Sequence, residues 1–116
     1  MIHVIQTLAE LDAQIIQSQS IPTFIFKHST RCGTSRNAHA RVQQFIETIT
    51  QEGHSFHLVM VRVIEEREIS NEISRRFSII HQSPQILLIR NGQLVWHASH
   101  QQIDPAQMRL ALLGKL

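Results

Sequence analysis

The chain has 116 residues, of which 42% are hydrophobic and 17% charged. This size predicts one domain over residues 1–116 with a core that needs no disulfide, and no apolar run approaches the length of a membrane span. The net charge of +2 comes with scattered arginines and 5% aromatic residues, a pattern that lacks the basic, aromatic-lined face of nucleic-acid-binding proteins.

The N-terminal residues and the cysteine content indicate a cellular compartment. Residues 1–10 lack the basic segment and apolar block of a secretory signal. One cysteine, Cys32, cannot form an internal disulfide, which fits a reducing cytosol. We therefore expect a cytoplasmic protein with no membrane or nucleic-acid partner.

The first half of the chain predicts two helices separated by a strand. Hydrophobic periodicity indicates an amphipathic helix over residues 5–17, and Ile21-Pro22 then breaks the pattern. A buried strand is expected over residues 23–26. A second helix is expected from Cys32 to Gln51, with Gly53 as its stop. The apolar face of this helix consists of Ala38, Val42, Phe45, Ile46 and Ile49.

The second half predicts three strands and two helices. Residues 57–64 are rich in β-branched side chains and nearly all apolar, which suits a central strand covered on both faces. A short helix over 68–77 precedes a strand over 85–89. Asn91-Gly92 is a strong hairpin signal and predicts a return strand over 93–97.

A final helix is expected to begin at Asp104-Pro105, which suit the N-cap and first-turn positions, and to end near Gly114. The resulting order, αβαβαββα, predicts an α/β thioredoxin-like fold with a central, mixed, four-stranded sheet flanked by helices. Ser83-Pro84 directly precedes the third core strand. In this fold a proline at that place is usually cis and faces the active-site sulfur, so we expect a cis peptide bond.

Cys32 is the candidate nucleophile because it lies where a strand ends and a helix begins. A thiol at a helix N-terminus faces unpaired N–H groups and the positive end of the helix dipole, which favour the reactive thiolate. Lys27, Arg31 and Arg36 add positive charge nearby. A lone cysteine is more often an inert core residue, but these polar and basic neighbours favour reactivity. Ser35, one turn further on, either hydrogen-bonds the thiolate or is an ordinary first-turn residue.

Other side chains are candidates for binding a small thiol. Arg31 and Arg36 either hold its carboxylates or are simply solvated. His28 ends the first strand and either lies beside the active loop or is a satisfied strand-end residue. His97 and His100 return to the same end of the sheet as Ser83-Pro84, where they line a thiol groove, assist proton transfer or have a structural role.

A metal site is a further possibility, because the chain has eight histidines. No His-x-x-x-His pair lies on a convincing helix, and only one cysteine is present as a soft ligand. We therefore expect no metal.

Four segments resemble the YtxJ-like monothiol bacilliredoxins, thioredoxin-fold proteins of the bacillithiol system. The segments are Lys27–Ser35, Ser70–Ile73, His81–Gln85 and Trp96–His100, and the likeness covers nearly the whole chain in order. It implies a thiol-disulfide oxidoreductase whose Cys32 removes bacillithiol from mixed disulfides on client proteins. No tightly bound cofactor is expected, and the partners would be S-thiolated clients and a low-molecular-weight thiol or a reductase.

Two positions qualify this interpretation. Ser35 stands where two-cysteine relatives carry a resolving thiol, so another thiol must release the adduct from Cys32. Gly33 replaces the proline that often follows the family's cysteine, which leaves the thiol pKa and reduction potential open. Two alternatives are a monothiol glutaredoxin-like module holding an iron–sulfur cluster, since the loop resembles Cys-Gly-Phe-Ser without its phenylalanine, and a non-catalytic thioredoxin-fold adaptor.

Overall fold

A computed structural model describes residues 2–31 and 33–116. Within these residues the strands are β1 (His3–Val4), β2 (Thr23–His28), β3 (His57–Arg62), β4 (Gln85–Arg90) and β5 (Gln93–Ser99). The helices are α1 (Leu8–Gln17), α2 (Gly33–Gln51), α3 (Arg67–Arg76), the short 3-10 helix η1 (His100–Gln102) and α4 (Pro105–Leu112).

The strands form one mixed sheet in the order β1-β3-β2-β4-β5. Strands β1, β3 and β2 run parallel, whereas β4 is antiparallel to both β2 and β5. Strand β2 lies at the centre and every one of its residues is buried. The peptide bond between Ser83 and Pro84, directly before β4, is cis, as predicted.

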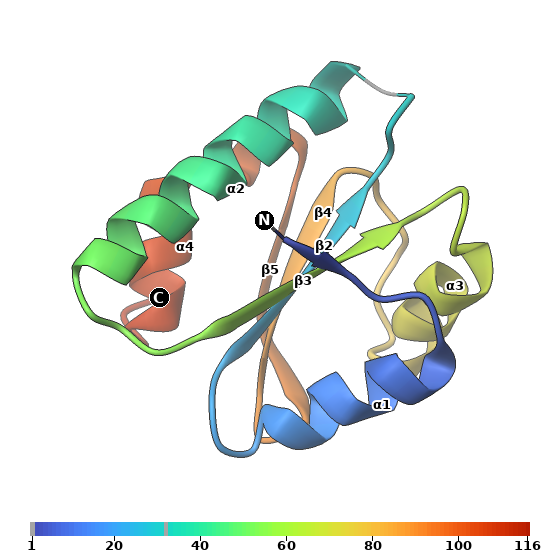
Figure 1. The fold of residues 1–116 in the computed structure, drawn as a ribbon, viewed down its shortest axis with the longest axis horizontal. Helices are drawn as coiled ribbons and strands as arrows, with labels where there is room; N and C mark the ends of the chain where they lie inside the picture. Colours follow the sequence, from blue (N-terminus) through green and yellow to red (C-terminus); the bar gives the residue numbers. More distant parts are fainter. Residues whose placement is uncertain (1, 32) are drawn as a thin grey trace.

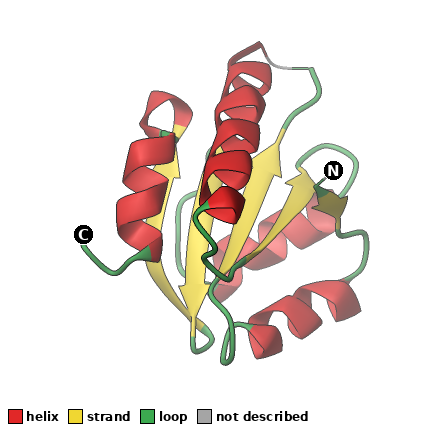
Figure 2. Ribbon diagram, turned by 60° about the vertical axis from the view of Figure 1, so that its left-hand side comes forward, coloured by secondary structure: helices red, strands yellow, loops and turns green. Residues whose placement is uncertain are grey.

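Helices cover both faces of the sheet (Figures 1 and 2). Helices α2 and α4 pack on one face, where Phe24 of β2 meets Phe45 of α2 edge to face, with ring centroids 5.3 Å apart. Helices α1 and α3 cover the other face through Leu11 and Ile73. Successive residues of β2 therefore contact opposite layers, as the alternation of a strand requires.

Local signals set several boundaries of these elements. Thr7 caps α1 by accepting a hydrogen bond from the Glu10 N–H, and Asp104 caps α4 by accepting from the Gln107 N–H. In the β4–β5 hairpin, Asn91 and Gly92 have φ values of 52° and 75°. These values match the two-residue turn that an Asn-Gly pair predicts.

The number of strands and the start of the first helix differ from the expectation, within the same fold class. The sheet has five strands, because His3–Val4 pairs with β3 and adds a short edge strand that the sequence analysis missed. Consequently Ile5 lies before α1, where its N–H donates to the Met60 carbonyl, and not inside a helix over 5–17. The apolar run expected to be a central strand is β3, which lies inside the sheet between β1 and β2 and packs into both core layers, as predicted.

None of the helices in the described part of the chain is long and apolar enough to cross a membrane.

Candidate active site

A groove of about 870 Å³ lies where α2 begins and β4 starts. Three segments line it: the first turns of α2, the connection from α3 to β4, and the end of β5 with η1. The lining residues are Thr34, Asn37, Arg41, Ser78, Ile79, Ile80, Gln82, Gln85, His97, Ser99, His100, Gln101 and Gln102. None of these residues is acidic, and one arginine and two histidines are among them. The groove therefore suits an anionic or strongly polar ligand.

Arg41 fixes one wall of the groove. Its Nε donates to the Ile103 carbonyl at 2.6 Å and its Nη2 to the His100 carbonyl at 2.9 Å, which ties η1 to α2. The His100 N–H in turn donates to the Pro84 carbonyl at 3.1 Å, and the His100 Nε2 lies 3.0 Å from the Gln82 Oε1. The cis Ser83-Pro84 segment and η1 are thus joined directly.

The loop that carries Cys32 is held at its base by two serines. The Ser29 N–H donates to the Oγ of Ser35, which is completely buried, and the Arg31 N–H donates to the Oγ of Ser29. Gly33, the residue after Cys32, is the first residue of α2. A Cβ added there would meet only the Arg36 Nη2, at 3.9 Å, so a larger residue fits.

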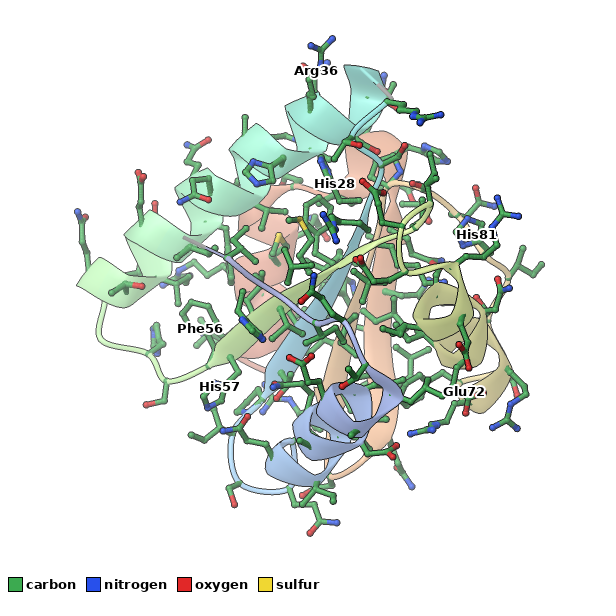
Figure 3. The ribbon with its side chains drawn as sticks, turned by 45° about the vertical axis from the view of Figure 1, so that its right-hand side comes forward. His28, Arg36, Phe56, His57, Glu72 and His81 are labelled. Carbon is green, nitrogen blue, oxygen red and sulfur yellow. The ribbon has the colours of Figure 1, made fainter. Side chains whose placement is uncertain are left out.

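His28, the last residue of β2, lies in the interior beneath the start of α2 (Figure 3). Its ring centroid is 5.3 Å from that of His39 on α2, and its Nδ1 is buried without a partner among the described residues. Burial lowers the pKa of His28, and the neighbouring His39 lowers it further. His28 is therefore neutral at pH 7 and has a free nitrogen that can exchange a proton.

Lys27 precedes His28 and contacts the opposite layer. Its Nζ lies 2.8 Å from the Ser74 Oγ on α3 and 3.2 Å from the His81 Nδ1, in the connection to β4. Burial lowers the pKa of the Lys27 amine from 10.5 to about 8. Burial also lowers the pKa of His81, with a further contribution from the Lys27 charge.

Unpaired polar atoms accumulate at this end of the sheet. The His28 Nδ1, the Ser83 Oγ and the Gln85 Oε1 are each buried without a hydrogen-bond partner in the part of the chain that the structure describes. Buried polar groups are normally paired, so atoms without a protein partner are available to a ligand or a water molecule. Two further atoms of this kind, on Gln14 and Ser70, lie on α1 and α3.

The structure brings together some of the predicted site residues. His97 and His100 line the groove, and Ser83 and Pro84 lie between the lining residues Gln82 and Gln85. The remaining candidates lie elsewhere: His28 and Ser35 are buried beside it, whereas Arg31 and Arg36 are exposed and do not line it. Arg36 extends outward from α2 (Figure 3). Cys32 itself lies outside the described residues, so its role stays a prediction from the sequence.

Sequence reasoning missed several residues of the groove. Arg41 is in the predicted second helix, next to the inward-facing Val42, but its hydrogen bonds reach residues 59 and 62 positions later in the chain. The amide side chains of Gln82, Gln101 and Gln102 also line the groove. The glutamines before β4 and after β5 were the sequence feature that could have indicated this polar lining.

No cluster of three or more potential metal ligands occurs within residues 2–31 and 33–116.

The fold agrees with comparisons to solved structures. A protein with a thioredoxin fold superimposes with a TM-score of 0.83 at 24% identity, over 94% of this chain and 91% of that one. The thioredoxin of Fasciola hepatica matches with a TM-score of 0.73 at 18% identity, over 99% of this chain and all of the other. Mitochondrial thioredoxin 3 of Saccharomyces cerevisiae also gives 0.73 at 18% identity, over 97% and 94%. The chain is thus a thioredoxin-fold protein.

A family comparison is more specific than the fold. Residues 3–108 match the sequence model of the family described as monothiol bacilliredoxin BrxC, so the chain belongs to this family. It is a thiol-disulfide oxidoreductase, as the resemblance predicted, and its partners are therefore thiols and disulfides.

Proposed function

We propose that this protein removes bacillithiol, or a similar low-molecular-weight thiol, from mixed disulfides on client proteins, with Cys32 as its nucleophile. The observation that carries this proposal is the groove that begins two residues after Cys32 in the sequence and has no acidic lining residue. Its arginine, histidines and amides suit a small thiol that carries carboxylates and hydroxyls.

In the first step the Cys32 thiolate attacks the small-thiol sulfur of the mixed disulfide. The bond between that sulfur and the client cysteine breaks, and the client leaves as a thiolate that takes a proton from water. Cys32 then holds the small thiol as a new disulfide. Ser35 cannot resolve this bond because it has no sulfur.

Release needs a second small thiol. Its thiolate attacks the adduct at the small-thiol sulfur, which frees the Cys32 thiolate and forms a symmetric low-molecular-weight disulfide. The protein therefore needs no tightly bound cofactor, and the small thiol is a co-substrate. We place this reaction in the cytoplasm, because thiols stay reduced there.

His28 and Ser35 support the reaction from beneath. Ser35 accepts a hydrogen bond from the Ser29 N–H and so holds the base of the cysteine loop. His28 is buried, and the pKa of its ring is lowered by burial, so at neutral pH it is a base that can accept a proton. Both are positioning or proton-transfer candidates, and neither lines the groove.

Intact-mass spectrometry of a transfer reaction tests the proposal. A client protein carrying one bacillithiol disulfide is mixed with the wild-type protein, and parallel reactions use the glutathione and cysteine disulfides of the same client. We expect the bacillithiol mass to leave the client and to be found on Cys32, faster than with the other thiols. Absence of transfer, or transfer that persists in Cys32→Ser, would contradict the proposal.

A further inference from the structure

Lys27 is a buried cation that the proposed reaction does not use. Its side chain has no exposure to solvent. The Nζ contacts the Ser74 Oγ and the His81 Nδ1, and no carboxylate of the described chain forms an ion pair with it. An ammonium without a counter-ion is unfavourable in a protein interior.

A second polar side chain lies directly beside Lys27. Gln85 is its partner in the antiparallel β2–β4 pairing, and the two side chains therefore emerge on the same face of the sheet. The Gln85 Nε2 donates to the Ile80 carbonyl at 3.0 Å. Lys27 contacts His81, the next residue along the chain. Paired positions on two neighbouring strands thus hold two consecutive residues of the segment between α3 and β4.

The segment held in this way is one wall of the groove. Ser78, Ile79, Ile80 and Gln82 line the groove, whereas Lys27 and His81 do not. The two ends of the segment have other anchors, because the Ile79 N–H donates to the Ser74 carbonyl at 3.0 Å and Gln82 contacts His100. Ile80, between them, is 80% exposed, so the polar contacts of Ile80 and His81 from beneath hold the middle of the segment.

We propose that Lys27 is a positioning residue for thiol-disulfide exchange: through its contact with His81 it holds the groove wall at residues 78–82 in the geometry that receives the mixed disulfide. Lys27 does not touch the substrate. Its ammonium donates to the neutral His81 ring, which joins the segment to β2, and separately to the Ser74 Oγ on α3. The inference rests on the proposed exchange reaction at this groove.

Four variants separate positioning from structural support. Lys27→Met keeps the aliphatic stem and removes the cation. His81→Leu removes the acceptor at an exposed residue, and His81→Gln supplies another acceptor. Ser74→Ala is the matched control, because it removes the other Lys27 contact, which does not reach the groove wall. The double variant Lys27→Met/His81→Leu tests whether the two residues act as one unit.

Steady-state kinetics with the client mixed disulfide provide the main measurement. We expect Lys27→Met and His81→Leu each to raise KM about tenfold, the size of a lost hydrogen bond to a charged group, with little change in kcat. The double variant should be no worse than either single variant. His81→Gln and Ser74→Ala should have a KM close to that of the wild type.

Hydrogen exchange of the backbone amides of residues 79–83 provides a measurement that does not need activity. We expect faster exchange there in Lys27→Met and His81→Leu, and not in Ser74→Ala. If Lys27→Met fails to fold, the exposed His81→Leu still tests the contact. If the wild-type protein does not prefer the bacillithiol disulfide, the proposed function fails in the wild type. The Lys27 and His81 variants would then be compared with the wild type on the mixed disulfide that the wild type cleaves.

Three results would overturn the inference. One is a folded Lys27→Met protein with wild-type KM and wild-type exchange at residues 79–83. Another is a double variant whose loss equals the product of the two single losses. The third is a Ser74→Ala variant that raises KM as much as His81→Leu does.

Discussion

The two ends of the sheet are built on different principles. At the hairpin end, the Asn91 N–H donates to the Ser18 carbonyl and the Gly92 N–H to the Ser18 Oγ, both at 2.9 Å, while the Ser18 hydroxyl donates to the Ile15 carbonyl. At the groove end, His28, Ser83 and Gln85 each leave a buried polar atom unpaired within the described residues, against the single Gln14 Oε1 in the last turn of α1, near Ser18.

This difference indicates which polar atoms are available to a ligand. Paired polar groups at the hairpin end stabilise the fold, and removing one partner of a pair lowers the free energy of unfolding. Unpaired polar groups at the groove end are unfavourable for folding, and proteins tolerate them mainly at functional sites. Substitutions at the two ends should therefore have opposite effects on stability and on activity.

The largest effect is expected at the groove end, from Cys32→Ser. We expect thiol exchange to fall to the uncatalysed rate, because a hydroxyl cannot form the mixed disulfide. The free energy of unfolding should change little. Transfer of the small thiol from a client, followed by intact mass, is the measurement. A Cys32→Ser protein that retains activity would place the nucleophile outside this chain.

Lys27→Met should change the pH dependence of stability. The folded protein loses the Lys27 proton near pH 8, whereas the unfolded chain keeps it until about pH 10.5. The unfolded state therefore binds more protons in this window, and the free energy of unfolding of the wild type should rise across it by roughly 3 kcal/mol. Urea titrations at pH values from about 7.5 to about 10.5 measure this rise in the free energy of unfolding.

A pair of lysine variants makes this measurement specific to Lys27, because the Cys32 thiol, with an ordinary pKa of about 8.5, also titrates in this window. The chain has no tyrosine, and Lys115 is the other lysine. Lys115→Met is the matched control, because Lys115 is exposed near the C-terminus. Lys27→Met should flatten the alkaline rise and Lys115→Met should not. An equal rise in both variants would show that another group titrates in this range.

Ser18→Ala tests the hairpin end. It leaves the half-buried Gly92 N–H without its acceptor, so we expect a loss of about 1 kcal/mol in the free energy of unfolding. Thiol exchange should be unchanged, since Ser18 is at the opposite end of β4 from the groove. Chemical denaturation and the transfer assay measure the two effects. A loss of activity in the folded variant would contradict the division between the two ends.

His28→Phe tests the groove end in the opposite sense. Removing an unpaired buried nitrogen should raise the free energy of unfolding by about 1 kcal/mol, while the exchange rate falls. Because burial lowers the pKa of His28, the unfolded chain binds a proton below about pH 6.5 that the folded protein does not. Wild-type stability should therefore fall with acid more steeply than that of the variant, and parallel curves would exclude this role.

Replacing one glycine at each end of the sheet should give the smallest difference in the free energy of unfolding. Gly33 begins α2 and has room for a Cβ, so Gly33→Ala should stabilise the fold by about 0.5 kcal/mol. Gly92 has a φ of 75°, which L residues rarely adopt, so Gly92→Ala should destabilise it. Thermal unfolding of the two variants measures both signs. The rate of Cys32 alkylation in Gly33→Ala shows how far this residue sets the reactivity of the thiol.

Elements with a strong local signal were predictable from the sequence. Asn91-Gly92 gave the hairpin, Asp104-Pro105 gave the start of α4, and Ser83-Pro84 gave the cis peptide bond. The two-residue strand His3–Val4 was not predictable, because it is too short to show a period and exists only through its pairing with β3.

The site was predictable only in part, for the same physical reason. The hairpin brings His97 and His100 to this end of the sheet, but a register shift between Leu88 and Ile89, which the turn does not predict, pairs His97 with Leu87 and so sets the face on which it lies. Arg41 and the segment around Ile80 were not predictable, because long-range hydrogen bonds set their positions. The Lys27–His81 contact joins residues 54 positions apart, and no pattern in the chain indicates it.

Trp96 is the only tryptophan of the chain, and there is no tyrosine. It is half-buried on β5, against the core, and its neighbour His97 lines the groove. Tryptophan fluorescence therefore comes from a single position, next to a residue that lines the groove. Ligand binding and global unfolding can both be followed by the intrinsic fluorescence of the protein, with no attached dye.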